Sequence, residues 1–115
     1  MPTATGDLLQ GTLAMLILKA LLVNQSTHGY GIARWIEQTT GDVLRIEEGS
    51  LYPALRRIED KGGVTSRWGV SENNRRARFY GITAAGREQL RAEGAVWTRY
   101  AAAVTSVMRA HPATT

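Results

Sequence analysis

The pattern of hydrophobic and polar positions along the chain predicts a helix, a polar break, two amphipathic helices, a β-hairpin and a long final helix. Residues 8–23 are apolar almost all round, with Lys19 as their only charge. A helix without a polar face must be covered on most sides. Because a small domain can hardly cover it alone, this segment favours a partner subunit. A second helix is predicted over 29–39, with Tyr30, Ala33 and Ile36 buried and Gly41 ending it.

Residues 48–61 form the clearest amphipathic segment. Apolar residues at spacings of three and four place Leu51, Ala54, Leu55 and Ile58 on one face. Arg56 points the opposite way. Ser50 is the expected N-cap and Gly62 the residue that ends the helix. The preceding residues 43–46 are predicted to form a short β-like link.

A β-hairpin and a long helix complete the pattern. The strands are predicted over 64–70 and 76–82, because the loop 71–75 is rich in turn residues. Thr83 is expected to cap a helix that runs to about Met108. Apolar and small residues on this helix follow a heptad spacing, which indicates packing against another helix. Residues 1–7 and 110–115 are expected to fray.

Composition places the chain among small globular domains, and the pattern of elements predicts a mainly α-helical fold with a small β-hairpin. The chain has 115 residues, 43% of them hydrophobic, and no cysteine, which excludes disulfides and thiolate metal sites and favours a reducing cytoplasm. Two histidines are too few for a histidine metal site. No signal peptide is evident, and the apolar run 13–23 is too short to cross a bilayer, so no membrane contact is expected.

The positive charge is concentrated in the predicted hairpin and its flanks. The formal net charge is +4, and residues 64–87 hold five arginines against one acid, Glu72. The remainder of the chain is balanced. A local basic excess of this kind favours a polyanionic partner.

Several motifs then resemble the PadR family of bacterial transcriptional regulators. They are HGYGI at 28–32, EGSLYPAL at 48–55 and ITAAGR at 82–87, together with WG and NRRA in the hairpin at 68–69 and 74–77. The resemblance covers roughly residues 8–97. It implies a winged helix-turn-helix over 8–82 and a C-terminal dimerisation helix over 83–109 that packs with helix 8–23. Gly63 and Gly81 depart from the family pattern, which usually has an apolar and a basic residue there.

A winged helix reads DNA with its second motif helix in the major groove and its hairpin on the backbone. Arg56 is the candidate for a guanine contact, and Tyr52 for a phosphate. The alternative is that Arg56 and Arg57 only solvate the helix and pair with Glu59 or Asp60. The predicted DNA-binding set is Ser50, Tyr52, Arg56, Arg57, Lys61, Asn74, Arg75, Arg76 and Arg78.

The expected protein is a homodimeric repressor that binds a pseudo-palindromic operator in double-stranded DNA and is released by a small effector. The predicted dimer interface comprises Leu9, Leu13, Leu16, Leu90, Trp97, Ala101, Val104 and Met108. Trp97 is expected in the interface core, and with Tyr100 it is also the candidate for stacking a planar effector. His28 is interpreted as a capping residue, with a sensor role as the alternative.

Catalysis has little support in the sequence. Paired carboxylates such as Glu59 and Asp60 are sequence neighbours, which do not face each other on a helix. No enzyme activity, cofactor or metal is therefore expected. Two alternatives remain open: a winged-helix module that binds an acidic protein, and an effector-binding dimer without its own operator.

Overall fold

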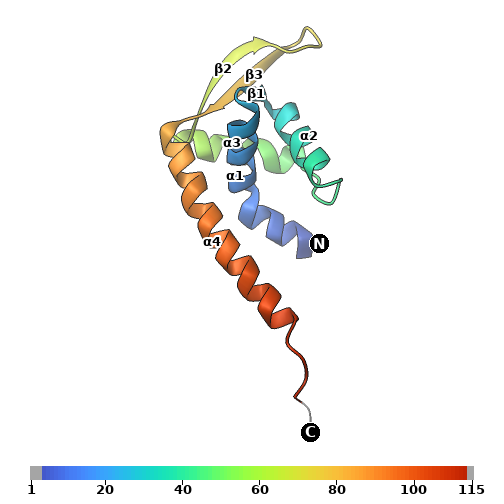
Figure 1. The fold of residues 1–115 in the computed structure, drawn as a ribbon. Coiled ribbons are helices and arrows are strands. Elements are labelled where there is room, and N and C mark those ends of the chain that lie inside the picture. Colours follow the sequence, from blue (N-terminus) through green and yellow to red (C-terminus); the bar gives the residue numbers. More distant parts are fainter. Residues whose placement is uncertain (1–3, 114–115) are drawn as a thin grey trace.

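In the computed structural model, residues 4–113 are described, with side chains from Gly6 onward. They form helices and a small sheet in the predicted order, with one additional short strand between the first two helices (Figure 1). The elements are α1 (Ala4–Asn24), β1 (Thr27–His28), α2 (Gly29–Thr39), α3 (Glu48–Asp60), β2 (Val64–Val70), β3 (Arg76–Ile82) and α4 (Ala84–Met108). The predicted fold class, mainly α-helical with a β-hairpin, is confirmed. The expected fraying of residues 1–7 is wrong for 4–7, which belong to α1, and residues 1–3 lie outside the described part.

Helix α1 lies at the centre of the fold and contacts α2, α3, α4 and β3. Its buried side is lined by Leu13, Ile17, Leu18, Ala20 and Leu21, and Leu51, Leu55 and Ile58 of α3 join the same core. Lys19 stays exposed. Residues 6–24 are long and apolar enough to cross a membrane by length and composition, which corrects the sequence argument from length. The core helix of a soluble protein passes the same test, and here α1 packs in the core.

The sheet is antiparallel in the order β1–β3–β2. The hairpin has the predicted bounds, and its register places Trp68 opposite Arg78 and Val70 opposite Arg76. The predicted β-like link at 43–46 is wrong, since these residues form bends and coil. The third strand is instead β1, whose His28 pairs with Phe79 and ties α2 to the hairpin.

Two local predictions for α2 and α3 are corrected. Tyr30 is 65% exposed, so its predicted burial is wrong, and Ile32 is buried instead beside Ala33 and Ile36. Helix α3 starts at Glu48 with Glu47 as its N-cap, so Ser50 lies in the first turn. Pro53 therefore sits inside the helix, where it leaves one hydrogen bond of the helix unmade.

The other predicted helix ends are confirmed. His28 caps α2, because its Nδ1 accepts a hydrogen bond of 3.0 Å from the amide of Gly31. Thr83 caps α4 in the same way, with its Oγ1 accepting from the amide of Gly86. Gly62, which follows the C-cap of α3, has φ +82°, a conformation that glycine adopts without strain.

Helix α4 projects away from the hairpin and gives the molecule an elongated shape of 67 × 29 × 24 Å (Figure 1). Its first half packs on the core through Leu90. Its second half carries exposed apolar side chains, among them Val104, Val107 and Met108.

Candidate nucleic-acid interface

The outer face of α3 is basic and open to solvent. Tyr52, Arg56 and Arg57 are exposed, and with Pro53 they line a shallow hollow of about 470 Å³. Among the described residues, neither Arg56 nor Arg57 forms an ion pair, so the expected alternative of pairing with Glu59 or Asp60 is not observed. Two guanidinium groups on this face are therefore free to bind an external acceptor.

Tyr52 packs on the start of α2. A Cβ atom at Gly29 would lie 2.7 Å from the Tyr52 hydroxyl oxygen, so only glycine admits the ring at this distance. Partial burial raises the pKa of the Tyr52 phenol above its ordinary value of 10.0, and the nearby Glu48 carboxylate raises it further. The hydroxyl is therefore protonated at neutral pH and can donate a hydrogen bond to a phosphate.

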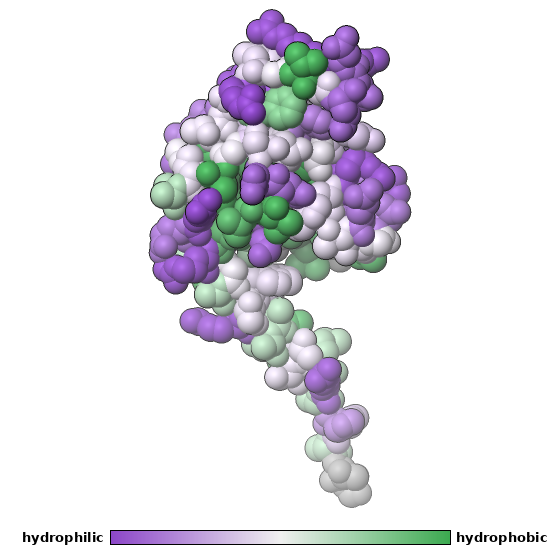
Figure 2. All heavy atoms as spheres, turned by 45° about the horizontal axis from the view of Figure 1, so that its top comes forward, coloured by the Kyte–Doolittle hydropathy of each residue, from purple (hydrophilic) through white to green (hydrophobic). Residues whose placement is uncertain are grey.

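The wing, meaning the β2–β3 hairpin with its loop 71–75, carries a cluster of arginines around an exposed tryptophan. The guanidinium carbon of Arg76 lies 4.5 Å from the centre of the Trp68 ring, and that of Arg78 lies 5.5 Å from it. Arg75 is exposed at the tip, where the amide of Ser71 donates to its carbonyl at 2.8 Å. Asn74 has φ +58° and so makes the turn itself. Figure 2 shows hydrophilic side chains gathered at this end of the molecule.

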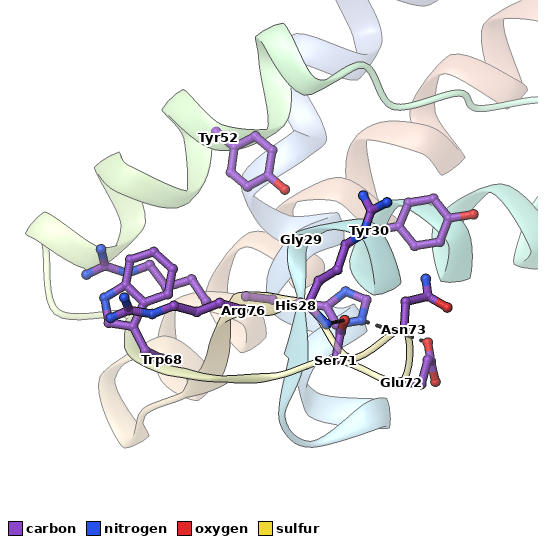
Figure 3. A pocket seen from close by; sticks show the side chains of 12 residues that line it. His28, Gly29, Tyr30, Tyr52, Trp68, Ser71, Glu72, Asn73 and Arg76 are labelled. Atoms are coloured by element: carbon purple, nitrogen blue, oxygen red, sulfur yellow. Dashed lines mark hydrogen bonds and ion pairs between the residues drawn. The ribbon is translucent and has the colours of Figure 1, made fainter.

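A cavity of about 550 Å³ separates the wing from α2 and α3. It is lined by Tyr52 of α3, Tyr30 of α2 and the Trp68–Arg76 pair of the wing (Figure 3). The structure thus brings Tyr52, Arg75, Arg76 and Arg78 from the predicted set to one concave surface. Arg56 and Arg57 continue this surface along α3.

Ser50 and Lys61 of the predicted set lie away from this surface, and Arg78 lies on it but is bound within the protein. Ser50 is half-buried, and its Oγ accepts a hydrogen bond of 3.1 Å from Gln10 of α1. Lys61 is exposed at the C-cap, at the far end of α3 from Tyr52. Arg78 is engaged within the protein, because its Nε donates to Ser66 Oγ at 2.9 Å.

Sequence reasoning did not single out Trp68 or Glu59 as parts of this surface. The contact between Trp68 and Arg78 could have been predicted from the hairpin. A five-residue loop between residues 70 and 76 sets the register of the two strands, and this register pairs Trp68 with Arg78. Nothing local to the sequence of α3 indicated that Glu59 would face Arg78, since that contact depends on how the wing folds back on the helix.

A second open surface lies along α1 and α4. Leu9, Leu16 and Leu90 are partly buried against the core, whereas Trp97, Val104 and Met108 are exposed. Leu13 is only 2% exposed and packs inside the core of its own chain, so it does not lie on the surface left for a partner. A groove of about 450 Å³ between the two helices is lined by Met15, Trp97 and Tyr100, among others. Within the described residues there is no cluster of three or more histidine, aspartate or glutamate side chains that could hold a metal ion.

A short sheet behind a three-helix core, with an arginine-bearing hairpin beside an exposed basic helix, defines a winged helix-turn-helix protein. The family model described as Transcriptional regulator PadR-like family matches residues 17–92. The chain therefore belongs to the PadR-like family of transcriptional regulators.

Solved structures agree with this assignment. A transcriptional regulator from Clostridium thermocellum is similar with a TM-score of 0.77 and 28% identity, over 87% of this chain and 96% of that one. A PadR family transcriptional regulator from Eggerthella lenta has a TM-score of 0.75 and 28% identity, over 91% of this chain and 88% of that one. An uncharacterized protein from Lysinibacillus sphaericus is 29% identical over 84 residues, 73% of this chain and 76% of that protein.

Proposed function

We propose that the protein is a sequence-specific DNA-binding repressor that acts in the cytoplasm as a homodimer. One observation carries the DNA-binding part of the proposal: Arg56 and Arg57 on α3 are exposed, form no ion pair among the described residues, and lie beside a concave surface that holds the wing arginines. Helix α3 enters the major groove, and Arg56 binds the O6 and N7 atoms of a guanine. Tyr52, Arg75 and Arg76 bind phosphates and fix the register of the protein on the duplex.

Substitution of Arg56 tests base recognition. We expect Arg56→Ala to weaken operator binding by about 1–3 kcal/mol and to relax the preference at one base position. The matched control is Arg109→Ala, because Arg109 is an exposed arginine at the opposite end of α4 from the wing. The operator fragment is first selected from genomic DNA, and affinities are measured by mobility shift. Equal affinities for Arg56→Ala and the wild type would refute the base contact.

The wing contacts are tested by salt. Each neutralised phosphate lowers the logarithm of the binding constant by about 0.9 for each tenfold rise in salt. The double variant Arg75→Ala/Arg76→Ala should therefore bind with a flatter salt dependence than the wild type. A wild-type affinity that does not change with salt would refute phosphate binding by the wing.

The dimer interface that we propose is formed by α1 and α4. The exposed apolar residues Trp97, Val104 and Met108 would be covered by the same residues of a second copy, with Leu9, Leu16, Leu90 and Ala101 beside them. A two-fold dimer presents two copies of α3 to DNA. The operator would then be pseudo-palindromic, with half-sites one or two helical turns apart.

The α1–α4 groove is also the site that we propose for a small planar effector. Trp97 and Tyr100 line it with their ring centres 6.4 Å apart, which suits contact with an aromatic molecule. Binding there would change how α4 packs and release the operator. A panel of planar aromatic compounds is screened by tryptophan fluorescence, and Trp97→Phe should lose the quenching while it still binds DNA. Quenching that persists in Trp97→Phe would place the compounds elsewhere.

A further inference from the structure

The three arginines at and near the wing tip are not equivalent. Arg75 and Arg76 are exposed and have no acidic partner among the described residues. Arg78 is held on three sides. Its Nε donates to Ser66 Oγ at 2.9 Å, its Nη2 lies 3.8 Å from Glu59 Oε2, and its guanidinium stacks near the Trp68 ring.

The contacts of Arg78 join three elements into one network. Glu59 comes from the last turn of α3, Ser66 from β2 and Arg78 from β3. The Ser66 hydroxyl donates to Glu59 Oε2 at 2.5 Å while it accepts from Arg78, so one side chain bridges the acid and the base. The Glu59 side chain is 33% exposed, and partly buried charges are screened by salt less than exposed ones. These contacts occupy the Nε and Nη2 atoms of Arg78, whose side chain is 46% exposed, so a phosphate at these two atoms must compete with Ser66 and Glu59.

We propose that Glu59 is a specificity-determining residue that keeps Arg78 from binding DNA phosphates and fixes the wing against α3. This inference rests on the proposed DNA-binding function. An additional arginine on phosphates strengthens binding to every sequence equally, because phosphate contacts carry no sequence information. Holding Arg78 therefore lowers sequence-independent binding, while the fixed angle between wing and helix keeps Tyr52 and Arg56 in register with the operator.

Glu59→Gln tests the proposal, with binding of the full chain to a mixed-sequence DNA duplex followed by fluorescence anisotropy over a series of salt concentrations. If the substitution frees Arg78, we expect tighter binding to this duplex at low salt. The slope of log affinity against log salt should become steeper by about 0.9 for each arginine that gains a phosphate. The ratio of operator affinity to mixed-sequence affinity should fall.

Two further variants separate the release of Arg78 from a simple change of charge. Glu72→Gln removes the same charge from the wing, where the Glu72 side chain is 84% exposed and its Oε1 lies 3.9 Å from His28 Nε2. This variant should leave the slope close to that of the wild type. Ser66→Ala changes no charge but removes the bridge to Arg78, so it should steepen the slope as Glu59→Gln does.

Three results would overturn the proposal. The first is that the wild type, Glu59→Gln and Ser66→Ala have equal slopes. The second is that Glu59→Gln and Glu72→Gln steepen the slope equally. The third is that the slope flattens by about 0.9 in Arg78→Ala, because this would show that Arg78 already binds phosphate. Thermal unfolding confirms that each variant is folded, and Ser66→Ala with Arg78→Ala decides the outcome if Glu59→Gln does not fold. A wild-type protein that binds no duplex DNA would overturn the proposed function itself, and this inference with it.

Discussion

At the scale of single residues, Tyr52 depends on a glycine in the neighbouring helix. The sequence placed Tyr52 beside the outer face of its helix as a candidate for a phosphate contact, and the structure adds that its ring lies against Gly29 at the start of α2. The side chain is therefore positioned by a residue that is distant in sequence. The spacing within α3 could predict which way Tyr52 points, but it carried no information about what the ring would touch.

Gly29→Ala should displace Tyr52. The new Cβ would lie 2.7 Å from the hydroxyl oxygen and 2.8 Å from Cε1, so the ring must move. We expect a loss of about 1–3 kcal/mol in the free energy of unfolding, as is typical of overpacking, together with weaker DNA binding. Chemical denaturation and mobility shift measure the two effects. Gly49→Ala is the control, because a Cβ there meets no atom within 4 Å, and a loss of the same size in that variant would contradict this explanation.

Alkaline pH should destabilise the fold through Tyr52 and Tyr80. Burial raises the pKa of both phenols above 10.0, with further increases from Glu48 at Tyr52 and from Glu59 at Tyr80, where Arg78 acts in the opposite direction. A raised pKa means that the folded state favours the neutral phenol. This contribution to stability is complete below pH 10 and is lost as the pH rises through the folded-state pKa values.

The double variant Tyr52→Phe/Tyr80→Phe should be less sensitive to pH in that range. The free energy of unfolding is measured by denaturation from neutral pH to above pH 10. The difference between the variant and the wild type should change only in the alkaline part of this range. A constant difference at every pH would refute the role of the two phenols.

At the scale of elements, α4 begins where two glycines bring backbones together. A Cβ at Gly86 would lie 2.1 Å from the carbonyl oxygen of Gly63, and that oxygen accepts hydrogen bonds from the amide and the hydroxyl of Thr83. Gly63 departs from the family pattern, yet here it is buried, and a Cβ would lie 2.8 Å from Ile58 Cγ2. The turn after α3 therefore holds the N-terminus of α4 at close range.

Gly86→Ala should loosen this junction. Because the atom it approaches is a backbone oxygen, α4 must shift and the Thr83 cap weakens, and we expect a loss of about 2–3 kcal/mol in unfolding free energy. Among the described residues, a Cβ at Gly94, further along α4, meets nothing within 4 Å outside the adjacent backbone of its own helix, so Gly94→Ala should gain up to about 1 kcal/mol from helix propensity. Thermal and chemical unfolding distinguish the two, and equal effects would contradict the close approach.

Most elements could be predicted from the sequence because their periodicity and end residues agree. The hairpin of 64–70 and 76–82 and the caps at Thr83 and Gly62 follow from turn and capping chemistry. β1 could not be found, since two residues carry no alternation and the strand exists only through pairing with β3. Ser50 was wrongly predicted as the N-cap of α3. The observed N-cap, Glu47, makes no capping hydrogen bond with its side chain, so the sequence carries no signal for the true start of the helix.

At the scale of the whole molecule, the apolar surfaces of α1 and α4 differ in how far the rest of the same chain covers them. The sequence suggested that residues 8–23 need a partner subunit, but α2, α3 and α4 of the same chain already cover the side that holds Leu13, Ile17 and Leu21. What stays open is the outer half of α4 together with exposed apolar residues of α1 such as Leu8, Leu22 and Val23. The heptad spacing of the sequence predicted which residues of α4 form an apolar seam. Which side of α1 packs in its own core and which side is left for a partner depends on the tertiary packing, and the sequence alone could not show it.

Val104→Asp should separate the proposed dimer. The Val104 side chain is exposed in the single chain, so the substitution should not disturb the fold of a subunit. In a two-fold interface, each subunit would bury the charge of the new aspartate without a partner, which is strongly unfavourable. The prediction is a folded monomer with unchanged helix content by circular dichroism. It should bind one half-site and lose the additional affinity that two linked half-sites provide. Sedimentation equilibrium and mobility shift on a full operator measure these changes.

Ser106→Asp is the matched control for the dimer test. It introduces the same charge two residues away, on the opposite side of α4, where Ser106 is exposed and its hydroxyl donates to the carbonyl of Ala102 in the same helix. This variant should remain dimeric and bind the operator as the wild type does. If both variants dissociate, or if the wild type binds its operator as a monomer, the α1–α4 interface is not the one that the protein uses. If only Val104→Asp dissociates, the apolar seam of α4 that begins at Leu90 is the dimer interface. Because this interface fixes how the two subunits are placed, it also fixes the distance between the two α3 helices and the spacing of the half-sites.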